Sequence, residues 1–461
     1  CDFHLATGAK TGIGYHATSD QPGEVVRMAP IQASLGDRKG FPQRPCAVLW
    51  DESLLWGVIA WRSLRDAGLA FDLVRAEEIR EGALSCYGMV FVPGGWASNK
   101  LDALGEAGRE AIRRFVADGG HYLGICGGAG LATQDGLGLL PIGRKPSSER
   151  VPSFSGRIRL ACAAHPIWKG IISPLFHAWW PSQLRITSPD PQVLACFGKP
   201  EADAFSSDIP VAGGEAAGWA GLEERYGILL DPARLNGEPA VVEGQFGRGR
   251  VILSLIHFDT PGDANGAAVL KNLWGCLALP GGGLPEAAGR ERANLVPKLP
   301  REALDAVGQM HAAVGDLITS GIRDGLWRWR TPWLLQWRRG VRGLEYATLA
   351  VMIDQIAGRI GTERLGGSAR SEAGAVDPLR LAEEIGEVRG RLILFCEEAG
   401  RLLAEERSCL AKGPLSPTAC GDEGIERRRT ELFGRAMSHG GRFKELIDRV
   451  DRLLFGLIRE R

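Results

Sequence analysis

HYLGICGGAG, residues 121–130, carries the strongest structural signal in this chain. A short apolar run, HYLGIC, passes directly into glycine and alanine, which is typical of a buried strand that turns sharply into a helix. Cys126 lies at the turn. A nucleophile there needs small neighbours, because a Cβ on either side would clash with the backbone or the substrate. Gly124, Gly127 and Gly128 provide that space, so the motif predicts a nucleophile elbow.

Strand and helix patterns alternate on the N-terminal side of this turn. Short apolar runs at 46–50, 70–74 and 87–92 predict strands. Amphipathic spacing followed by glycine predicts helices over 53–68 and 101–120. Strands that alternate with helices favour βαβ units and therefore a mostly parallel sheet.

The pattern is looser on the C-terminal side of the turn. Strand-like segments occur at 156–162, 192–197 and 225–230. VVEGQFGRGRVILSLIHFD, residues 241–259, predicts two strands around a glycine-rich turn. Apolar spacing over 264–279 predicts a helix that closes the α/β part of the chain.

The remaining segments differ in composition and in the spacing of their apolar residues. Residues 1–43 are polar and glycine-rich and are expected to form an N-terminal extension, which puts the α/β domain at 44–280. LPGGGLPEAAG indicates a linker over 281–300. From 301 to 461, leucine and alanine recur at helical spacing among charged residues, which predicts an all-α helical domain. Its helical segments are expected at 301–320, 323–360, 378–411 and 424–460.

The composition is ordinary for a globular protein. Of 461 residues, 44% are hydrophobic and 24% are charged, and 55 basic residues balance 55 acidic ones. A net charge of zero argues against electrostatic binding of nucleic acid over the whole chain, so no nucleic-acid partner is expected. No uncharged apolar run of about 18 residues is present, which argues against a membrane-spanning helix.

The cysteines point to a reduced protein. Ten cysteines are far fewer than a disulfide-stabilised chain of this length would carry. No CxxC pair and no zinc-like Cys/His spacing occurs, so neither a metal nor another cofactor is expected. The expected location is the cytoplasm. Cys1 leaves one alternative open, because a processed N-terminal cysteine can carry the lipid of a lipoprotein.

Cys126 has candidate catalytic partners further along the chain. A helix that starts at a cysteine puts its positive end at the sulfur, which favours the nucleophilic thiolate. A thiolate also needs a base and a group that orients the base. His257 and Asp259 follow an apolar strand and are two residues apart, so on an extended chain both point to the same side. The alternative is a buried cysteine and a surface histidine without catalytic roles.

VPGGWASNK, residues 92–100, is a candidate for the oxyanion hole. Backbone N–H groups after Gly94 and Gly95, toward Trp96, could stabilise a developing negative charge. A plain Gly-Gly turn is the alternative. All three motifs follow predicted strands, and open α/β sheets carry their sites at the carboxyl ends of strands.

In this order, the PGG turn, the GxCxG turn and the HxD pair resemble the class I glutamine amidotransferase fold. VFVPGGW, FVADGGHYLGICGGAG and GQFGRGRVILSLIHFD most resemble the amidotransferase-like domain found at the N-terminus of some biotin–protein ligases. That family also occurs as a separate bacterial protein. The resemblance covers about 44–280 and implies a flavodoxin-like sheet with a nucleophile elbow.

The resemblance also implies a role for each residue of the site. Cys126 would be the nucleophile, His257 the base and Asp259 the acid that orients it. Together they would cleave a glutamine-like or other amide C–N bond through a thioester, with a small-molecule amide as substrate.

Two positions depart from the family pattern. The resemblance places oxyanion donors near Gly95 and Trp96 and at Gly127, but Gly130 stands where active glutaminases usually have glutamine. The acid is aspartate at 259, where glutamate is usual. The alternative function is therefore a catalytically inactive binding or regulatory module, whose helical domain docks a protein partner or a second copy of the chain through 301–461.

Other motifs rank lower. GRGR, residues 247–250, is similar to a biotin-ligase loop, but no second ligase signature is present, so ligase activity is not expected. His121 begins the strand before Cys126 and is expected to be structural. His165 precedes a proline in a loop that could border the pocket.

A tryptophan- and arginine-rich segment, WRWRTPWLLQWRRGVR, occupies 327–342. Thr331 followed by Pro332 predicts a helix start, with Trp333 and Trp337 on one face. The expected role of these tryptophans is to form a core stripe edged by arginine. The alternatives are a partner interface or a membrane-surface contact through Trp327, Trp333 and Trp337.

Overall fold

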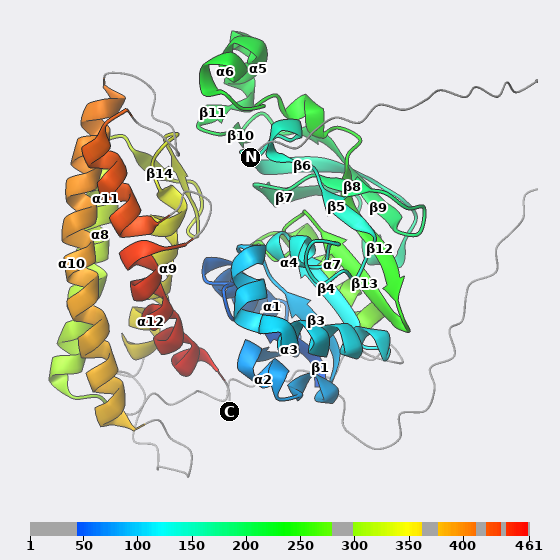
Figure 1. Cartoon of the computed structure of the whole chain (residues 1–461), viewed down its shortest axis with the longest axis horizontal. Coiled ribbons are helices and arrows are strands. Elements are labelled where there is room, and N and C mark those ends of the chain that lie inside the picture. The colour runs from blue at the N-terminus through cyan, green and yellow to red at the C-terminus, as the bar shows by residue number, and fades with distance from the viewer. Residues whose placement is uncertain (1–43, 279–297, 362–376, 412–420, 435–438, 460–461) are drawn as a thin grey trace, which may run out of the picture. The chain divides into compact units, whose positions relative to one another are not determined.

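A computed structural model describes residues 44–278, 298–361, 377–411, 421–434 and 439–459 (Figure 1). The predicted extension at 1–43 and nearly all of the predicted linker at 281–300 lie outside these residues, so both domain boundaries stay predictions. The described residues belong to one compact unit. Within them, no helix is long and apolar enough to cross a membrane.

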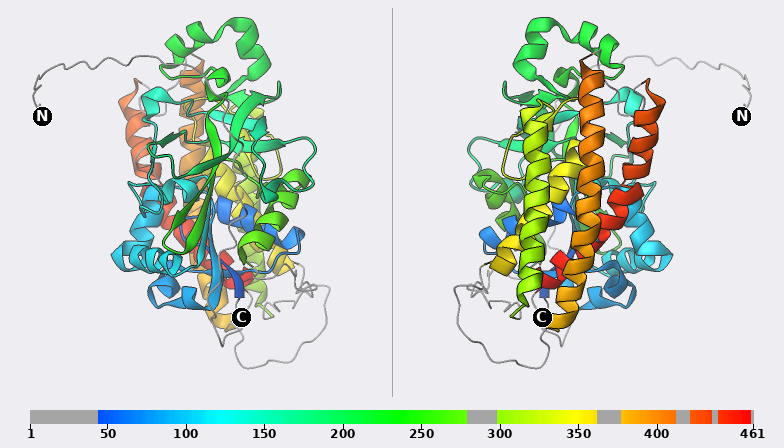
Figure 2. Two further views of the ribbon diagram at one scale, coloured as in Figure 1. Left: turned by 90° about the vertical axis from the view of Figure 1, so that its right-hand side faces the viewer. Right: turned by 90° about the vertical axis from the view of Figure 1, so that its left-hand side faces the viewer.

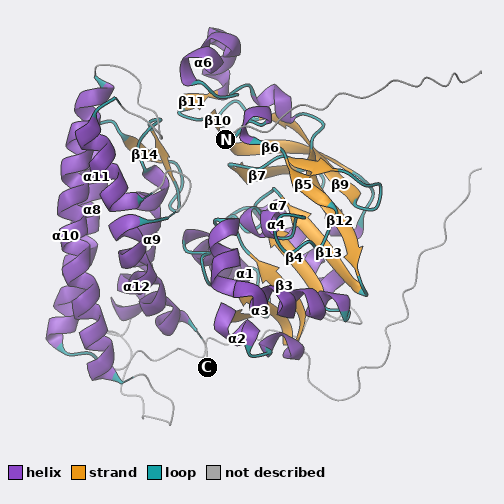
Figure 3. Cartoon of the chain, in the orientation of Figure 1, coloured by secondary structure: helices purple, strands orange, loops and turns teal. Residues whose placement is uncertain are grey.

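The apolar runs around Cys126 form the parallel half of a mixed sheet (Figure 3). Its strands lie in the order β2-β1-β3-β4-β13, and each neighbouring pair is parallel. This is the strand order of flavodoxin-like sheets. The expected fold class is therefore confirmed. The strands are β1 (Arg44–Leu49), β2 (Asp72–Val74), β3 (Tyr87–Val92), β4 (His121–Ile125) and β13 (Gly249–Ser254).

Two groups of helices pack against this half of the sheet. α3 contacts both α2 and α4, and α1 contacts α7. In α3, buried residues recur every four positions from Leu104 to Val116, which gives the helix one apolar face. The helices are α1 (Leu55–Asp66), α2 (Ala76–Arg80), α3 (Ala97–Ala117), α4 (Gly127–Leu131) and α7 (Ala264–Leu273). Apolar spacing predicted α1, α3 and α7.

An antiparallel half extends the sheet beyond β13, in the order β12-β9-β6-β10-β11, with β7 also paired to β6. β5 and β8 form a separate pair. These strands are β5 (Ile142–Arg144), β6 (Phe154–Cys162), β7 (Leu175–Trp179), β8 (Leu184–Ile186), β9 (Gln192–Pro200), β10 (Phe205–Ser206), β11 (Ile209–Pro210) and β12 (Pro239–Phe246). The predicted hairpin over 241–259 is confirmed as β12 and β13.

The strand predicted at 225–230 is wrong. Residues 211–226 form two short helices, α5 (Val211–Ala217) and α6 (Trp219–Tyr226). α6 ends at Gly227, whose φ of 64° is the left-handed conformation of a helix C-terminus. The apolar residues that follow lie in a loop. The single-turn helices are Ala83–Cys86, Ser147–Glu149, Pro166–Trp168, Pro232–Leu235 and the π-turn Trp274–Ala278.

The C-terminal part is mainly helical, as expected. α8 and α10 run side by side (Figure 2), and α9 and α12 pack together. In α12, buried residues from Phe443 to Ile458 recur at helical spacing. The predicted segment 424–460 divides into two helices. The helices are α8 (Arg301–Arg323), α9 (Gly343–Gly361), α10 (Pro378–Leu410), α11 (Glu423–Phe433) and α12 (Gly441–Ile458).

The helix predicted around Trp333 and Trp337 is wrong. Tryptophan and arginine alternate there with period two, and the segment forms an antiparallel hairpin of β14 (Trp327–Trp329) and β15 (Leu335–Trp337). The Thr331 hydroxyl accepts hydrogen bonds from the backbone N–H groups of Trp333 and Leu334. The expected cap is therefore real, but it closes a hairpin turn and not a helix.

Candidate active site

Cys126 lies between β4 and α4 with a strained backbone. Its φ is 54° and its ψ is −108°, a conformation that costs a non-glycine residue about 1–3 kcal/mol. Its N–H donates to the Ser254 carbonyl over 2.8 Å, which ties the turn to β13. A Cβ at Gly127 would collide with the carbonyl oxygen of Gly95, and one at Gly128 with that of Val92. The glycines of the motif thus allow the close approach of the elbow and the PGG loop.

Gly127→Ala is therefore expected to destabilise the protein by about 2 kcal/mol or more, because backbone and not a movable side chain occupies the space of the new methyl group. Gly143→Ala is the matched control, since nothing lies within 4 Å of a Cβ at that position. Urea unfolding measures both. Equal unfolding midpoints for the two variants would contradict the close approach of Gly127 to Gly95.

His257 and Asp259 form a fully buried pair directly after β13. Nδ1 of His257 lies 2.9 Å from Oδ1 of Asp259, and neither side chain is exposed. Among the described residues, Nε2 of His257 has no partner with ordinary hydrogen-bond geometry. Burial lowers the pKa of His257, but the charge and hydrogen bond of Asp259 and the adjacent Cys126 thiol together raise that pKa to about 10. The imidazole is therefore protonated at neutral pH beside a cysteine.

The PGG loop lies next to the elbow. β3 and β4 are in register from Met89 and His121 to Val92 and Gly124, so Gly94, Gly95 and Trp96 follow β3 where Cys126 follows β4. Gly95 has a φ of 113°, which favours glycine. Gly127 is the first residue of α4, and the N–H of a first helical residue has no intrahelical acceptor. The backbone here can offer donors to an oxyanion.

Tryptophans lie beside the histidine, and sequence reasoning missed two of them, Trp56 and Trp180. The centroid of the Trp56 ring, on α1, lies 4.6 Å from the centroid of the His257 ring. The ring centroids of Trp180 and Trp56 are 6.2 Å apart, and those of Trp180 and Trp337, in the β14–β15 hairpin, are 5.0 Å apart. Trp327, in β14 of the same hairpin, is buried. The hairpin is therefore linked to His257 by a chain of ring contacts that runs from Trp337 through Trp180 and Trp56.

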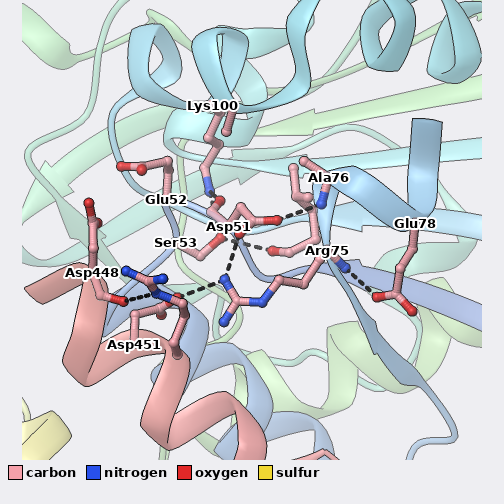
Figure 4. Close-up of polar contacts among 12 residues, drawn as sticks. Asp51, Glu52, Ser53, Arg75, Ala76, Glu78, Lys100, Asp448 and Asp451 are labelled. Carbon is pink, nitrogen blue, oxygen red and sulfur yellow. Dashed lines mark hydrogen bonds and ion pairs between the residues drawn. The ribbon is translucent and has the colours of Figure 1, made fainter. Parts of the chain in front are cut away.

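A buried lysine reaches the turn between β1 and α1 (Figure 4). Lys100 of α3 is 0% exposed, and its ammonium donates to Oγ of Ser53 over 2.5 Å and to the carbonyl of Asp51 over 3.3 Å. Burial lowers the pKa of Lys100 to about 7, and Glu52, Asp51, Asp451 and Cys126 oppose that shift. Lys100 sits one helical turn beyond Trp96, a spacing that could have indicated its proximity to the site.

Lys100 holds the β1–α1 turn, residues 51–54, against the PGG loop. A Cβ at Gly95 would collide with the Glu52 carbonyl, so the turn and the loop touch. Glu52 and Leu54 have φ values of 56° and 47°. Such strained residues persist only where their surroundings hold them.

The C-terminal part also forms ion pairs with residues of this turn (Figure 4). Lys444 of α12 pairs with Glu52 at 2.9 Å. Arg75, which precedes α2, pairs with Asp51 at 2.7 Å and with Asp451 of α12 at 3.1 Å. These charges pair with one another, but Nη2 of Arg75 and Oδ1 of Asp451 are buried without a hydrogen-bond partner among the described residues. A cavity of about 190 Å³ lies among them. α12 thus contacts a turn that touches the PGG loop.

The lower-ranked histidines lie away from the His257–Asp259 pair and have structural partners. Nδ1 of His121 accepts from the backbone N–H of Arg250 at 3.1 Å. Nε2 of His165 pairs with Glu243 at 3.1 Å, and its Nδ1 accepts from Ile167.

Comparison with known proteins agrees with this geometry. A family model described as biotin-protein ligase, N terminal, matches residues 74–135, which include the PGG loop and Cys126. Phosphoribosylformylglycinamidine synthase subunit PurQ of Symbiobacterium thermophilum is 30% identical over 164 residues, which cover 31% of this chain and 67% of that protein. The chain belongs to the class I glutamine amidotransferase-like family.

Solved structures match about half of this amidotransferase-like chain. A putative GMP synthase protein from Thermoplasma acidophilum is 13% identical, with a TM-score of 0.33, and the match covers 51% of this chain and 94% of that one. A glutamine amidotransferase is 19% identical, with the same TM-score, and the match covers 51% and 98% of the two chains.

Proposed function

We propose that this amidotransferase-like chain cleaves the C–N bond of a small carboxamide through a thioester on Cys126. The observation that carries the proposal is the buried His257–Asp259 pair beside the strained Cys126 turn. The pKa of about 10 places an imidazolium beside Cys126, and a cationic neighbour is the kind of environment that activates a cysteine nucleophile.

The first half of the reaction forms the thioester. The Cys126 thiolate attacks the amide carbon, and the carbonyl electron pair moves to oxygen, where N–H groups near Gly95 and Gly127 bind it. As the tetrahedral intermediate collapses, Nε2–H of His257 donates its proton to the leaving nitrogen. Ammonia departs, and the imidazole is left neutral.

The second half consumes water. Neutral His257 takes a proton from water, whose oxygen attacks the thioester carbon. The intermediate expels the Cys126 thiolate, which regenerates the thiolate–imidazolium pair. The products are one carboxylic acid and one ammonia for each amide and water. Asp259 holds Nδ1–H throughout and stabilises the imidazolium.

A chloroketone analogue of glutamine, 2-amino-5-chloro-4-oxopentanoate, tests this proposal. At pH 6.5 we expect it to alkylate Cys126 at least about tenfold faster than Cys162, because a thiolate and not a thiol is the reactive form. Cys162 is a suitable internal control, since burial raises its pKa to about 11. Mass spectrometry of the labelled peptides gives both rates.

Turnover supplies the second readout. Carboxamides that slow the labelling of Cys126 should release ammonia with the intact protein and none with Cys126→Ser. The proposal is refuted if Cys126 and Cys162 react at the same rate across pH 6–9.

The second candidate function is a binding module without turnover, and Gly130 favours it. The glutamine usual at this position in active glutaminases is absent. In that case a carboxamide would protect Cys126 from alkylation without releasing ammonia, and Cys126→Ser would bind it unchanged.

A further inference from the structure

The outer faces of α8 and α10 are exposed in the described part of the chain. The two helices lie side by side (Figure 2), and two contacts fix their relative position. Cδ1 of Leu317 lies 4.0 Å from the position of a Cβ on Gly400. Asp324 pairs with Arg407 at 3.1 Å. Both contacts advance along the two helices in the same direction, so α8 and α10 run parallel. Levels along them can therefore be compared by counting from Leu317 and Gly400.

Glycine and leucine lie on this exposed surface. Gly308 of α8 and Gly390 of α10 are exposed, and a Cβ at either position would have no atom within 4 Å. Leu394 of α10 is 62% exposed. Glycine is among the least favourable residues inside a helix, and alanine would fit at both glycine positions. Nothing in the described part of the chain accounts for the two glycines, whereas the close approach of a partner would.

Unpaired charges of both signs lie on the same surface. Asp305 and Asp316 are exposed on α8, and Arg389 and Arg401 are exposed on α10. Asp305 has one ion-pair partner among the described residues, Arg301 at 3.8 Å, and the other three have none there. The surface therefore offers both acids and bases to a partner.

A second copy of the chain complements this surface when a two-fold axis between the copies runs along the helices. Such an axis keeps every residue at its level and lays α8 of one copy over α10 of the other. Residues that face each other across the axis are then within two positions of the same level, and each pair forms twice. The facing pairs are Arg301 with Glu383, Asp305 with Arg389, Gly308 with Gly390, Ala312 with Leu394, and Asp316 with Arg401.

A two-fold axis across the helices gives a different result. It would lay α8 antiparallel on α8, and α10 antiparallel on α10. Near the middle of the surface, Asp305 would then face Asp316. Arg389 would face Arg401 in the same way. Like charges repel each other, so the surface favours the axis that runs along the helices.

We propose that the chain forms a homodimer through the outer faces of α8 and α10, with the helices of the two copies parallel. Glycine opposite glycine lets the helices approach closely, and leucine opposite alanine packs a large side chain against a small one. Opposite charges fix the register of the pairing. A second copy is the occupant because one chain supplies both members of every pair.

Charge reversal in the whole chain tests the dimer. Asp305→Arg with Asp316→Arg makes the surface of α8 basic, and Arg389→Asp with Arg401→Asp makes that of α10 acidic. Either double variant should raise the dimer dissociation constant at least about thirtyfold, because attractive pairs become repulsive. The variant with all the reversals restores opposite charges and should dimerise within about threefold of wild type. Analytical ultracentrifugation measures these constants.

Gly390→Leu tests the close approach, and Gly456→Leu on α12 is its matched control. Both glycines are exposed helix positions with no atom within 4 Å of a Cβ. Urea unfolding should therefore show that neither substitution destabilises the monomer. Only Gly390→Leu should raise the dimer dissociation constant, by about tenfold or more.

Three results would overturn the proposal. The first is a wild-type chain that stays monomeric at about 100 µM. The second is a dimer that both double variants leave intact, since that dimer would use another surface. The third is equal weakening in the double variants and in the variant with all the reversals, because the restored charges would then have no effect on the register.

Discussion

Asp259→Asn is expected to slow the alkylation of Cys126 at pH 6.5 by about a thousandfold. Burial lowers the pKa of His257, and Asp259 is the main group that raises it. Without the carboxylate, the imidazolium loses its stabilisation and the amide favours the wrong tautomer, a change that costs a Ser-His-Asp triad about ten thousandfold. The rate of labelling by the glutamine chloroketone, measured from pH 5 to pH 9, checks the prediction.

A second His–Asp pair in the same part of the chain provides the control. Nδ1 of His177 lies 2.8 Å from Oδ2 of Asp263, outside the proposed catalytic set. Asp263→Asn makes the same chemical change and keeps an oxygen that can cap α7. Its labelling rate should stay within about twofold of wild type. Equal losses in the two variants would mean that Asp259 acts through stability and not through His257.

Lys100→Met is expected to change how stability depends on pH. The pKa of Lys100 is about 7 in the folded protein and near its ordinary value of 10.5 when unfolded, so between pH 7 and pH 10 the unfolded chain binds one more proton there. The free energy of unfolding therefore rises with pH on account of Lys100. The pKa of His257 is raised from 6.5 to about 10, so its contribution falls over the same interval.

The two contributions oppose each other in the wild type. Removal of the lysine leaves His257 unopposed, and the free energy of unfolding should fall relative to wild type by about 1.4 kcal/mol for each pH unit between 7 and 10. Over the whole interval the difference reaches about 4 kcal/mol. Urea unfolding at pH 7, 8 and 9 measures it, and the other ionisable groups cancel because they titrate in both proteins.

Lys444→Met is the control for Lys100. Lys444 contacts the same turn through Glu52, but burial does not outweigh its partners Asp448 and Glu52, which raise its pKa above 10.5. Its charge is thus the same in folded and unfolded chains between pH 7 and pH 9. Parallel pH profiles for Lys100→Met and wild type would show that Lys100 is charged throughout that interval.

The parallel half of the fold could be predicted because its signals are local. Each strand before Cys126 is an apolar run that ends at glycine, proline or a helix start, and the order of these elements fixes the topology. The antiparallel half was harder to predict. β7 and β10 pair with β6 through contacts that no local pattern records, and alternation in WRWR (327–330) was outweighed by the apparent helix cap at Thr331.

The candidate site divides in the same way. Cys126 and the His257–Asp259 pair belong to motifs of a few residues, so their chemistry could be inferred from spacing. Lys100 and Trp180 could not be identified in this way. One is a lysine on an amphipathic helix and the other a tryptophan near a strand end, and each is marked only by what it contacts in the folded chain.

The ion pairs between α12 and the β1–α1 turn affect the order in which the protein folds during synthesis. Lys444 and Glu52 are 392 positions apart, and contacts of such long range form late in folding. Synthesis proceeds from the N-terminus, so the sheet, Cys126 and the His257–Asp259 pair emerge from the ribosome before α12 exists. A nascent chain would then hold Cys126 in its strand-to-helix turn while the turn beside the PGG loop is still free. The candidate site would be complete only after translation has passed α12, as a final step of maturation.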